Sequence, residues 1–289
     1  MKVALFANIT KKESFELGKN IIAFFRDHEV EVVTREDESK NFGIPSLSTV
    51  KPEEIDFLIS CGGDGTILRL VHHFPHILAP IVGINLGHLG FMADIPLEDL
   101  YESLEDLIKK KIIIQNRLMM EGMTTSGEKC FAVNEMVIHR AKNPSLIDLS
   151  IHVDGTYLDT FSADGVIIAT PSGSTAYSLA AGGPILTPEL EAFVITPISP
   201  HTISNRPIVI LPKENIEVQY LSPYEPVEIT YDGISRYNIA TNDVFTISRS
   251  SRTFKMVSFA RRDFFSTLRK KMGWSGRVRY SSLNKEELS

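Results

Sequence analysis

Cysteine is scarce in this chain of 289 residues, which contains only Cys61 and Cys130. A scaffold held by disulfides needs several bridges, and a structural zinc site needs ligands at short, regular spacings. Two isolated cysteines support neither arrangement. We expect both thiols to be reduced, as they are in cytoplasmic proteins.

Long apolar runs are also missing. No stretch approaches the roughly 18 apolar residues that a membrane-spanning helix requires. The N-terminal sequence MKVALFANIT has a short apolar run but no small-residue cleavage site. We therefore expect no membrane segment and no secretory signal, and the N-terminal run is typical of a buried first strand.

Positive charge is not in excess, because 30 Lys and Arg residues face 36 Asp and Glu residues, for a formal net charge of −6. This balance argues against a dedicated nucleic-acid-binding protein. Hydrophobic residues make up 43% of the chain. That share supports a sizeable core, and the length fits two modest domains or one large one.

Strand and helix patterns alternate in the first part of the chain. The expected strands are 2–8, 30–34, 55–60 and 80–85, and the expected helices are 14–25, 66–74 and 97–111. Alternation of this kind predicts a mostly parallel sheet with helices on both faces. We expect a Rossmann-like α/β domain over residues 1–116.

Short strand-like runs separated by turn residues fill the rest of the chain, and one of them is CFAVNEMVIHR at residues 130–140. Asp154-Gly155, Asp164-Gly165 and Asp232-Gly233 are typical of hairpin turns. We expect an all-β, sandwich-like domain over residues 117–258. The helical pattern near the C-terminus, in segment 259–276, is expected to pack back on the first domain, and residues 277–289 are expected to form a mobile tail.

One glycine turn carries a lone carboxylate. The stretch FLISCGGDGTIL, residues 57–68, runs from an expected strand into a helix expected to begin near Thr66. Gly62, Gly63 and Gly65 allow a ligand close to the backbone, and the N-terminus of a helix favours phosphate. The first strand is not followed by G-x-G-x-x-G, and G-x-x-x-x-G-K-[ST] is absent, so a phosphate site of another type is predicted.

Asp64 has two interpretations from its position alone. It could cap the helix, or it could hold magnesium or accept a proton from a hydroxyl that attacks a phosphate. The stretch TPSGSTAYSLAAGGPI, residues 170–185, favours a functional role. Its hydroxyl and amide groups suit a ribose and a pyrophosphate, and Tyr177 could stack on a base.

Taken together, the motifs of this chain resemble those of the bacterial NAD kinases, which transfer phosphate from ATP or polyphosphate to the 2′-hydroxyl of the adenosine ribose of NAD. The matching motifs are GGDGT at 62–66, GINLGHLGF at 83–91, NE at 134–135, SADG at 162–165, TPSGSTAYSLAAGGPI at 170–185, SPHTISNRPIV at 199–209 and YDG at 231–233. Their order and spacing carry the resemblance, because GGDGT alone also occurs in lipid kinases and phosphofructokinases.

The resemblance implies a role for each matching residue. Asp64 is the implied catalytic base, Asn134 and Glu135 hold the ribose hydroxyls, and Asp164 lies near the nicotinamide end. The implied NAD-binding residues are Asp64, Gly65, Arg69, Asn134, Glu135, Asp164, Thr175, Ala176, Tyr177, Ser178, Leu179 and Ala180. The implied phosphate-donor residues are Gly62, Gly63, Gly65 and Thr66.

The resemblance also implies a cofactor and an assembly. Mg²⁺ is expected to arrive with ATP, with Asp64 as the one candidate protein ligand. NADP is the implied product, and a homodimer or homotetramer is expected through the β domains, whose strand edges need covering. No nucleic acid or membrane is expected as a partner.

Some positions depart from the family pattern or favour another interpretation. Ser162 stands where some members have a basic residue, and Ile234 stands where many have Gln. A lipid or other small-molecule kinase with the same turn is the alternative, but such lipid kinases usually continue the turn with Asn-Glu-Val. His72 and His73 are adjacent on an expected helix, so they point to different faces and are not expected to bind a metal together.

Overall fold

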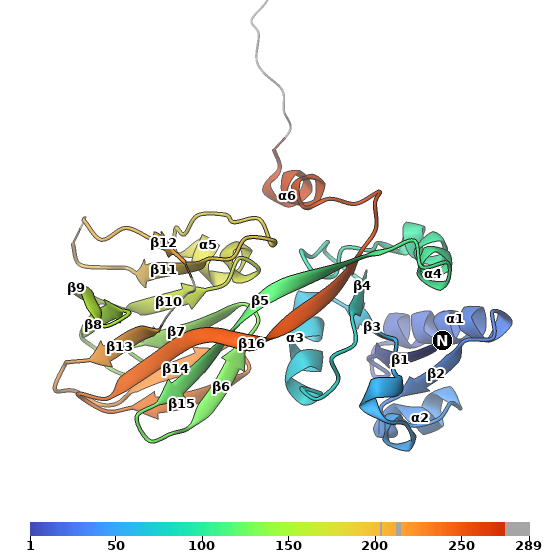
Figure 1. Ribbon diagram of the computed structural model, residues 1–289, viewed down its shortest axis with the longest axis horizontal. Helices are drawn as coiled ribbons and strands as arrows, with labels where there is room; N and C mark the ends of the chain where they lie inside the picture. Colours follow the sequence, from blue (N-terminus) through green and yellow to red (C-terminus); the bar gives the residue numbers. More distant parts are fainter. Residues whose placement is uncertain (203, 212–214, 275–289) are drawn as a thin grey trace, which may run out of the picture.

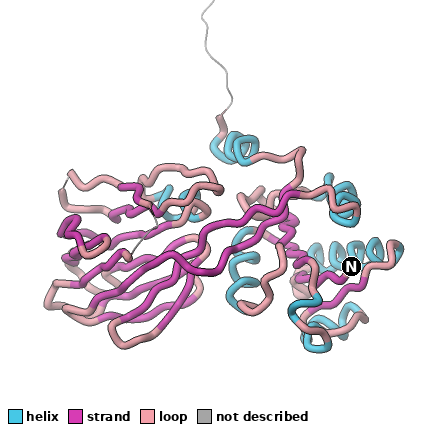
Figure 2. The backbone as a smooth tube through the Cα atoms, viewed as in Figure 1, coloured by secondary structure: helices cyan, strands magenta, loops and turns pink. Residues whose placement is uncertain are grey.

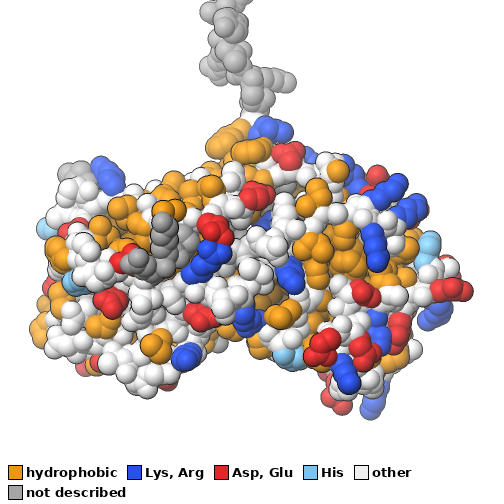
Figure 3. All heavy atoms as spheres, in the orientation of Figure 1, with side chains coloured by type: hydrophobic (Ala, Val, Ile, Leu, Met, Phe, Trp, Pro, Cys, Tyr) orange, Lys and Arg blue, Asp and Glu red, His pale blue; other side chains and the backbone are white. Residues whose placement is uncertain are grey.

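The computed structural model describes residues 1–202, 204–211 and 215–274. It has an α/β lobe and a β lobe joined by two long strands (Figures 1 and 2). Figure 3 shows the two lobes and the notch between them at the lower edge of this view. The tail predicted at 277–289 lies outside the described residues.

The α/β lobe is built on a parallel sheet with strand order β2-β1-β3-β4. Its strands are β1 (Lys2–Ala7), β2 (Glu31–Thr34), β3 (Phe57–Gly62) and β4 (Ile81–Asn85). Its helices are α1 (Lys12–Asp27), α2 (Glu36–Phe42), α3 (Asp64–His73) and α4 (Leu100–Ile108), with short 3₁₀ turns η1 (Leu47–Thr49), η2 (Pro52–Glu54) and η3 (Leu97–Asp99).

Both faces of this sheet are buried, as the continuous apolar strands predict. Alternate residues of β1 point to opposite faces: Val3 and Leu5 join the core formed with α1 and α4, and Ala4 and Phe6 join the core formed with α3. The predicted α/β fold with helices on both faces is confirmed. This arrangement brings the glycine turn, between β3 and α3, to the carboxyl edge of the sheet.

The β lobe packs a six-stranded sheet, in the order β12-β11-β10-β7-β14-β15, against the far part of a ten-stranded sheet. Its strands are β5 (Ile113–Thr124), β6 (Lys129–Ala132), β7 (Glu135–His139), β8 (Ile147–Val153), β9 (Thr156–Ala163), β10 (Gly165–Ala169), β11 (Phe193–Ile198), β12 (Ile208–Ile210), β13 (Ile216–Tyr220), β14 (Val227–Tyr231), β15 (Ser235–Ile239) and β16 (Val244–Ser258). Turn η4 (Gly173–Thr175) and helix α5 (Tyr177–Ala180) follow β10. The predicted sandwich-like β fold is confirmed.

The two lobes share one sheet. Strands β5 and β16 pair antiparallel along their length, and β16 joins β4 in parallel at Met256 and Ile81. Figure 1 shows both strands crossing from one lobe to the other. The proposed bounds of the two domains, which fall within β5 and just after β16, remain a prediction.

The C-terminal helix α6 (Phe264–Met272) packs back on the α/β lobe, as predicted. Asp263 caps its start by accepting from the Ser266 N–H at 2.9 Å. The Phe264 ring lies 5.7 Å from the Phe91 ring, and Lys271 Nζ donates to the Leu89 carbonyl at 2.6 Å. Helix α6 therefore rests on the loop that follows β4.

Four local features differ from the sequence expectations. Helix α2 and strand β11 were not expected, and α3 begins at Asp64 rather than near Thr66. The strand expected over 130–140 is broken at Val133 and Asn134. The break has a physical cause, because the Asp232 carboxylate draws the backbone N–H groups of residues 133–135 out of the strand ladder.

Candidate active site

Asp64 is held by the backbone of a distant loop. Its Oδ2 accepts from the Phe91 N–H at 2.9 Å, and its Oδ1 accepts from the N–H groups of Met92 at 3.0 Å and Ala93 at 2.8 Å. Within the described part of the chain, its side chain makes no cap bond to α3, whose N-cap is Gly63. The capping interpretation is therefore wrong. Three donors occupy three of about four lone-pair positions of the carboxylate, which leaves one for a ligand.

Gly90 is required for this arrangement. A Cβ atom at Gly90 would lie 2.0 Å from Asp64 Oδ1 and 2.8 Å from its Cγ. Real Cβ atoms do not approach other atoms so closely, so any side chain here displaces either the carboxylate or the loop. Gly90, near the end of the GINLGHLGF motif, thus makes room for the carboxylate of Asp64.

The loop that holds Asp64 is anchored on its far side by arginine. Arg262, just before α6, donates from one guanidinium nitrogen to the Asp94 carbonyl at 2.7 Å and pairs through the other with Asp99. Burial raises the pKa of the Asp94 carboxyl to about 6, while the charges of Arg262 and Arg117 act in the opposite direction. Arg262 therefore anchors the loop to the segment just before α6.

The turn glycines leave open space. A Cβ at Gly63 or Gly65 would meet no atom within 4 Å in the described residues, whereas at Gly62 it would meet Thr66 Oγ1 at 2.4 Å. The positive-φ glycines lie elsewhere, for example at Gly43 and Gly182, and Gly63 has a φ of −106°. The glycines therefore serve to leave room beside the backbone rather than to form a left-handed turn.

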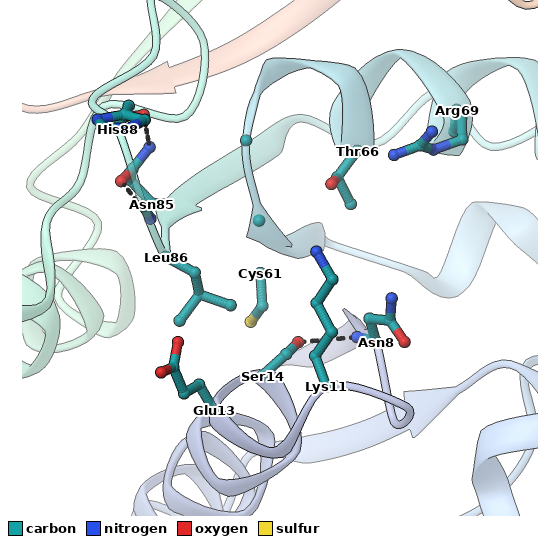
Figure 4. Close-up of a pocket in the computed structure, with 13 residues that line it drawn as sticks. Asn8, Lys11, Glu13, Ser14, Cys61, Thr66, Arg69, Asn85, Leu86 and His88 are labelled. Carbon is teal, nitrogen blue, oxygen red and sulfur yellow. Dashed lines mark hydrogen bonds between the residues drawn. The ribbon is translucent and has the colours of Figure 1, made fainter.

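A hollow of about 270 Å³ opens in front of this turn. It lies where β1, β3 and β4 end, which is where open α/β sheets bind ligands. Figure 4 shows Lys11 extending toward the turn, with Thr66 and Arg69 on α3 beside it. Two cationic side chains and the start of α3 favour an anion here.

A second hollow, of about 450 Å³, adjoins the first and shares Lys11, Thr66 and Arg69 with it. Arg35 lines it and pairs with the buried Glu38 at 2.6 Å. In the described residues, Arg35 Nε is buried without a hydrogen-bond partner. The two hollows lie side by side on the α/β lobe, and we call them together the cation-lined groove after Lys11, Arg35 and Arg69, although Glu13 and Glu38 also line them.

Asn134 and Glu135 lie at the break between β6 and β7. Their exposed fractions are 6% and 8%. Among the described residues, Asn134 Oδ1 and Glu135 Oε2 have no hydrogen-bond partner. Buried polar atoms are normally paired, so two unpaired atoms at consecutive residues indicate a place where a ligand supplies the missing partners.

The Glu135 carboxyl is a weak acid in this environment. Burial, and then the negative charge of Asp232, raise its pKa to about 8, and the Tyr177 backbone N–H acts in the opposite direction. At neutral pH the group is therefore mostly protonated in the unliganded protein. It can then donate a hydrogen bond as well as accept one.

The stretch 170–185 packs tightly on this segment. Thr170 Oγ1 donates to the Val133 carbonyl at 2.6 Å, and a Cβ at Gly173 would lie 2.1 Å from the Asn134 carbonyl oxygen. Tyr177 is exposed by 46%, which leaves its ring free for a ligand. Ser178 is fully buried and its Oγ bonds Thr196 Oγ1 at 2.9 Å, so its side chain supports the fold.

The remaining predicted positions have different settings. Thr175 and Ala176 are partly exposed in and after η4, while Leu179 and Ala180 lie in α5. Asp164, after β9, pairs with Arg140 Nε at 2.7 Å, a partner that the sequence did not indicate.

The two residues that depart from the family pattern, Ser162 and Ile234, lie in different parts of the β lobe. Ser162 donates to Asp148, and Ile234 is exposed by 36% at the tip of the β14–β15 turn.

Several neighbours of the site received no role from the sequence, although Asn85, Gly90 and Asp232 lie in the matching motifs. They are Asn8, Lys11, Arg35, Asn85, Gly90, Asp94, Asp232 and His72. Lys11, directly before the first helix, and Asn85, at a strand end, could have been found from the rule that loops at the carboxyl edge bind ligands. Asp232 and His72 could not, because 160 residues separate them.

Over residues 1–202, 204–211 and 215–274, no group of three or more His, Cys, Asp and Glu side chains could hold a metal ion. In the same residues, every helix is too short or too polar to cross a bilayer.

Comparisons with known proteins agree with this architecture. The ATP-NAD kinase N-terminal domain family matches residues 3–112, and the ATP-NAD kinase C-terminal domain family matches residues 133–259. The NAD kinase of Protochlamydia amoebophila is 57% identical over 277 residues, covering 96% of this chain and 99% of that protein. The NAD kinase of Moorella thermoacetica is 34% identical, covering 95% and 90%.

Two solved structures share the fold. The crystal structure of yeast NADH kinase complexed with NADH has a TM-score of 0.86 and 25% identity, covering 97% of this chain and 90% of that one. An NAD kinase from Archaeoglobus fulgidus in complex with ATP has a TM-score of 0.75 and 27% identity, covering 93% and 99%. With both family domains matched in order and close relatives matched over nearly the whole length, this chain belongs to the NAD kinase family, and its activity is the phosphorylation of NAD.

Proposed function

We propose that this chain transfers the terminal phosphoryl group of ATP to the 2′-hydroxyl of the adenosine ribose of NAD, giving NADP and ADP, with Asp64 between the two substrates. The observation that carries this assignment is the pair of buried polar atoms without partners, Asn134 Oδ1 and Glu135 Oε2. A vicinal diol supplies two adjacent hydroxyls, each of which can donate or accept, so it suits both the amide oxygen and the carboxyl. Neither the matching families nor the relatives named above favour the alternative, a lipid or other small-molecule kinase with the same turn.

NAD occupies the side of the site formed by the β lobe. Asn134 and Glu135 hold the ribose hydroxyls, and Tyr177, with the backbone of η4 and α5, lies along the dinucleotide. Asp164 faces the nicotinamide end, and its pairing with Arg140 at 2.7 Å fixes the direction of its carboxylate. These roles are supported by the burial of the first pair and the exposure of the Tyr177 ring.

ATP occupies the cation-lined groove of the α/β lobe. Its terminal phosphates lie at Gly62, Gly63, Gly65 and Thr66, where a helix N-terminus and open space meet. Arg69 lines both hollows beside these glycines, so we assign it to the donor phosphates rather than to NAD. Lys11 serves the same phosphates, and the larger hollow beside Arg35 takes the rest of the donor.

Asp64 receives the proton of the attacking hydroxyl. Three backbone N–H groups fix its carboxylate, so it is oriented before NAD binds. Phosphoryl transfer depends mainly on positioning and on charge stabilisation. A fixed carboxylate next to the hydroxyl contributes to the positioning. The cationic side chains of Lys11 and Arg69 contribute to the charge stabilisation.

The residues fit a magnesium ion that arrives with ATP rather than a resident one. Magnesium is usually bound by one or two carboxylates together with substrate phosphates. The backbone donors leave one lone-pair position on Asp64, which the attacking hydroxyl needs, so the donor phosphates and water would hold the ion beside Asp64. Bound there, the ion would spread the negative charge of the donor phosphates.

A homodimer or homotetramer is part of the proposal. Edge strand β12 exposes Ile208 by 38% and Val209 by 46%, and Leu211 beyond it by 61%. An apolar edge strand is a surface that proteins cover. We place the enzyme in the cytoplasm, in keeping with the free, buried thiols of Cys61 and Cys130.

The test is an assay of the purified protein with ATP, magnesium and NAD, in which NADP is measured with an NADP-specific dehydrogenase. The expected result is that the dehydrogenase finds NADP to reduce only when both NAD and ATP were present in the reaction. Asn134→Ala should raise the KM for NAD and leave the KM for ATP unchanged. Absence of NADP, with phosphate transferred to a lipid instead, would overturn the assignment.

A further inference from the structure

The two ends of helix α3 are attached to different parts of the site. Asp64, its first residue, is held by the loop 91–93, and His72, its ninth, lies about 12 Å further along the axis. His72 Nε2 lies 2.8 Å from Asp232 Oδ2, across the boundary between the lobes. Because an ionised carboxylate only accepts, the imidazole is the donor.

Asp232 in turn holds the ribose segment. Its carboxylate accepts from the N–H groups of Val133 and Asn134, each at 2.8 Å, and of Glu135 at 3.2 Å. The first two of these N–H groups lie in the break between β6 and β7, and the third belongs to the first residue of β7. The fully buried carboxylate of Asp232 thus binds both the backbone of residues 133–135 and the imidazole of His72 on α3.

The imidazole is held in place by packing as well as by this bond. The His72 ring stacks on Phe131 with centroids 4.5 Å apart and planes 7° apart. The Arg252 guanidinium lies 5.1 Å from the same Phe131 ring and donates to the Pro75 carbonyl, just beyond α3. The side chain of His72 is 9% exposed, so its orientation is fixed.

We propose that His72 is a positioning residue, which through Asp232 sets the distance between Asn134–Glu135 and Asp64, so that the ribose hydroxyl meets the base. The inference rests on the proposed roles of these three residues. Nothing in the resemblance or in the spacing of the sequence assigned His72 to the site. The helix acts as a rigid spacer, with the base at one end and the support of the substrate at the other.

The test compares variants of His72 that distinguish the effect of its hydrogen-bond donor from the effect of its aromatic ring. His72→Phe keeps an aromatic ring for Phe131 and removes the donor, His72→Ala removes both, and His72→Gln restores a donor. His76→Phe, at an exposed histidine in the loop after α3, is the matched control. We expect His72→Phe and His72→Ala to lower kcat/KM for NAD by roughly 10- to 100-fold, with the KM for ATP unchanged. His72→Gln should recover most of the loss, and His76→Phe should equal the wild type.

A role in folding alone would give another result. The melting temperature would fall, yet the kinetic constants per folded molecule would stay at the wild-type values. That outcome, or equal losses in His72→Phe and His72→Gln, would overturn the proposal.

Hydrogen exchange separates this proposal from the proposed function. The amides of Asn134 and Glu135 should exchange faster in His72→Phe than in the wild type, whatever the enzyme phosphorylates. Unchanged exchange at these amides would also contradict the positioning role.

Discussion

Asp64 and Gly90 form the closest fit in the site, and a methyl group at Gly90 tests it. A Cβ there would lie 2.0 Å from Asp64 Oδ1. Gly90→Ala should therefore lower kcat by roughly 10- to 100-fold, because the carboxylate moves away from the hydroxyl, with little change in the KM for NAD. Steady-state kinetics check this. A variant with a lowered melting temperature but a normal kcat would show that Gly90 matters only for folding.

Glu135 predicts a pH dependence of stability. Its pKa is about 8 in the folded protein, against an ordinary value of 4.5. Because the folded state then binds more protons than the unfolded state, this group makes stability fall as pH rises from about 5 to about 8. Glu135→Gln removes the effect, so its melting temperature relative to the wild type should rise across this window. A difference that does not vary with pH would contradict the raised pKa.

At the residue scale, the sequence alone left Asp64 with two interpretations. Its partners are the amides of residues 91–93, more than 25 positions away, and no local pattern reveals them. Asn134 and Glu135 were identified only through the family resemblance. By themselves they would have been ordinary polar residues at a strand end, because their burial depends on Asp232 and on the segment after β10.

Helix α6 offers a test at the scale of one element. Phe264 packs on Phe91, whose N–H binds Asp64, whereas the neighbouring Phe265 is exposed by 55%. Phe264→Ala should lower the free energy of unfolding by about 1–2 kcal/mol and reduce kcat several-fold, since the loop loosens. Phe265→Ala should stay within about 0.5 kcal/mol of the wild type. Equal effects of the two substitutions on kcat would contradict the role of α6.

Regular elements with strong periodicity were predicted well. The four parallel strands and the helices α1, α3 and α4 follow from buried apolar runs and helical spacing. Helix α2 was missed because its sequence, EDESKNF, is mostly polar and its one buried side chain is Glu38. The break after β6 was missed because its cause, Asp232, lies about 100 residues further along the chain.

The whole molecule is predicted to assemble through the β lobe. Val209→Lys places a charge on the exposed edge strand β12 and should convert the wild-type oligomer to monomers, because a lysine there opposes edge pairing. Leu97→Lys, at a residue exposed by 50% on the α/β lobe, should leave the assembly intact. Sedimentation measures both variants. A wild-type protein that sediments as a monomer would contradict this assembly.

The central claim is that one carboxylate, fixed by the α/β lobe, receives the proton of a ribose held by the β lobe. The most direct measurement is the single-turnover rate of NADP formation by the wild type, Asp64→Asn and the exposed control Asp27→Asn. The account predicts a loss of about 10²- to 10⁴-fold for Asp64→Asn, with NAD still bound and with wild-type rates for Asp27→Asn. Full turnover by Asp64→Asn would contradict it.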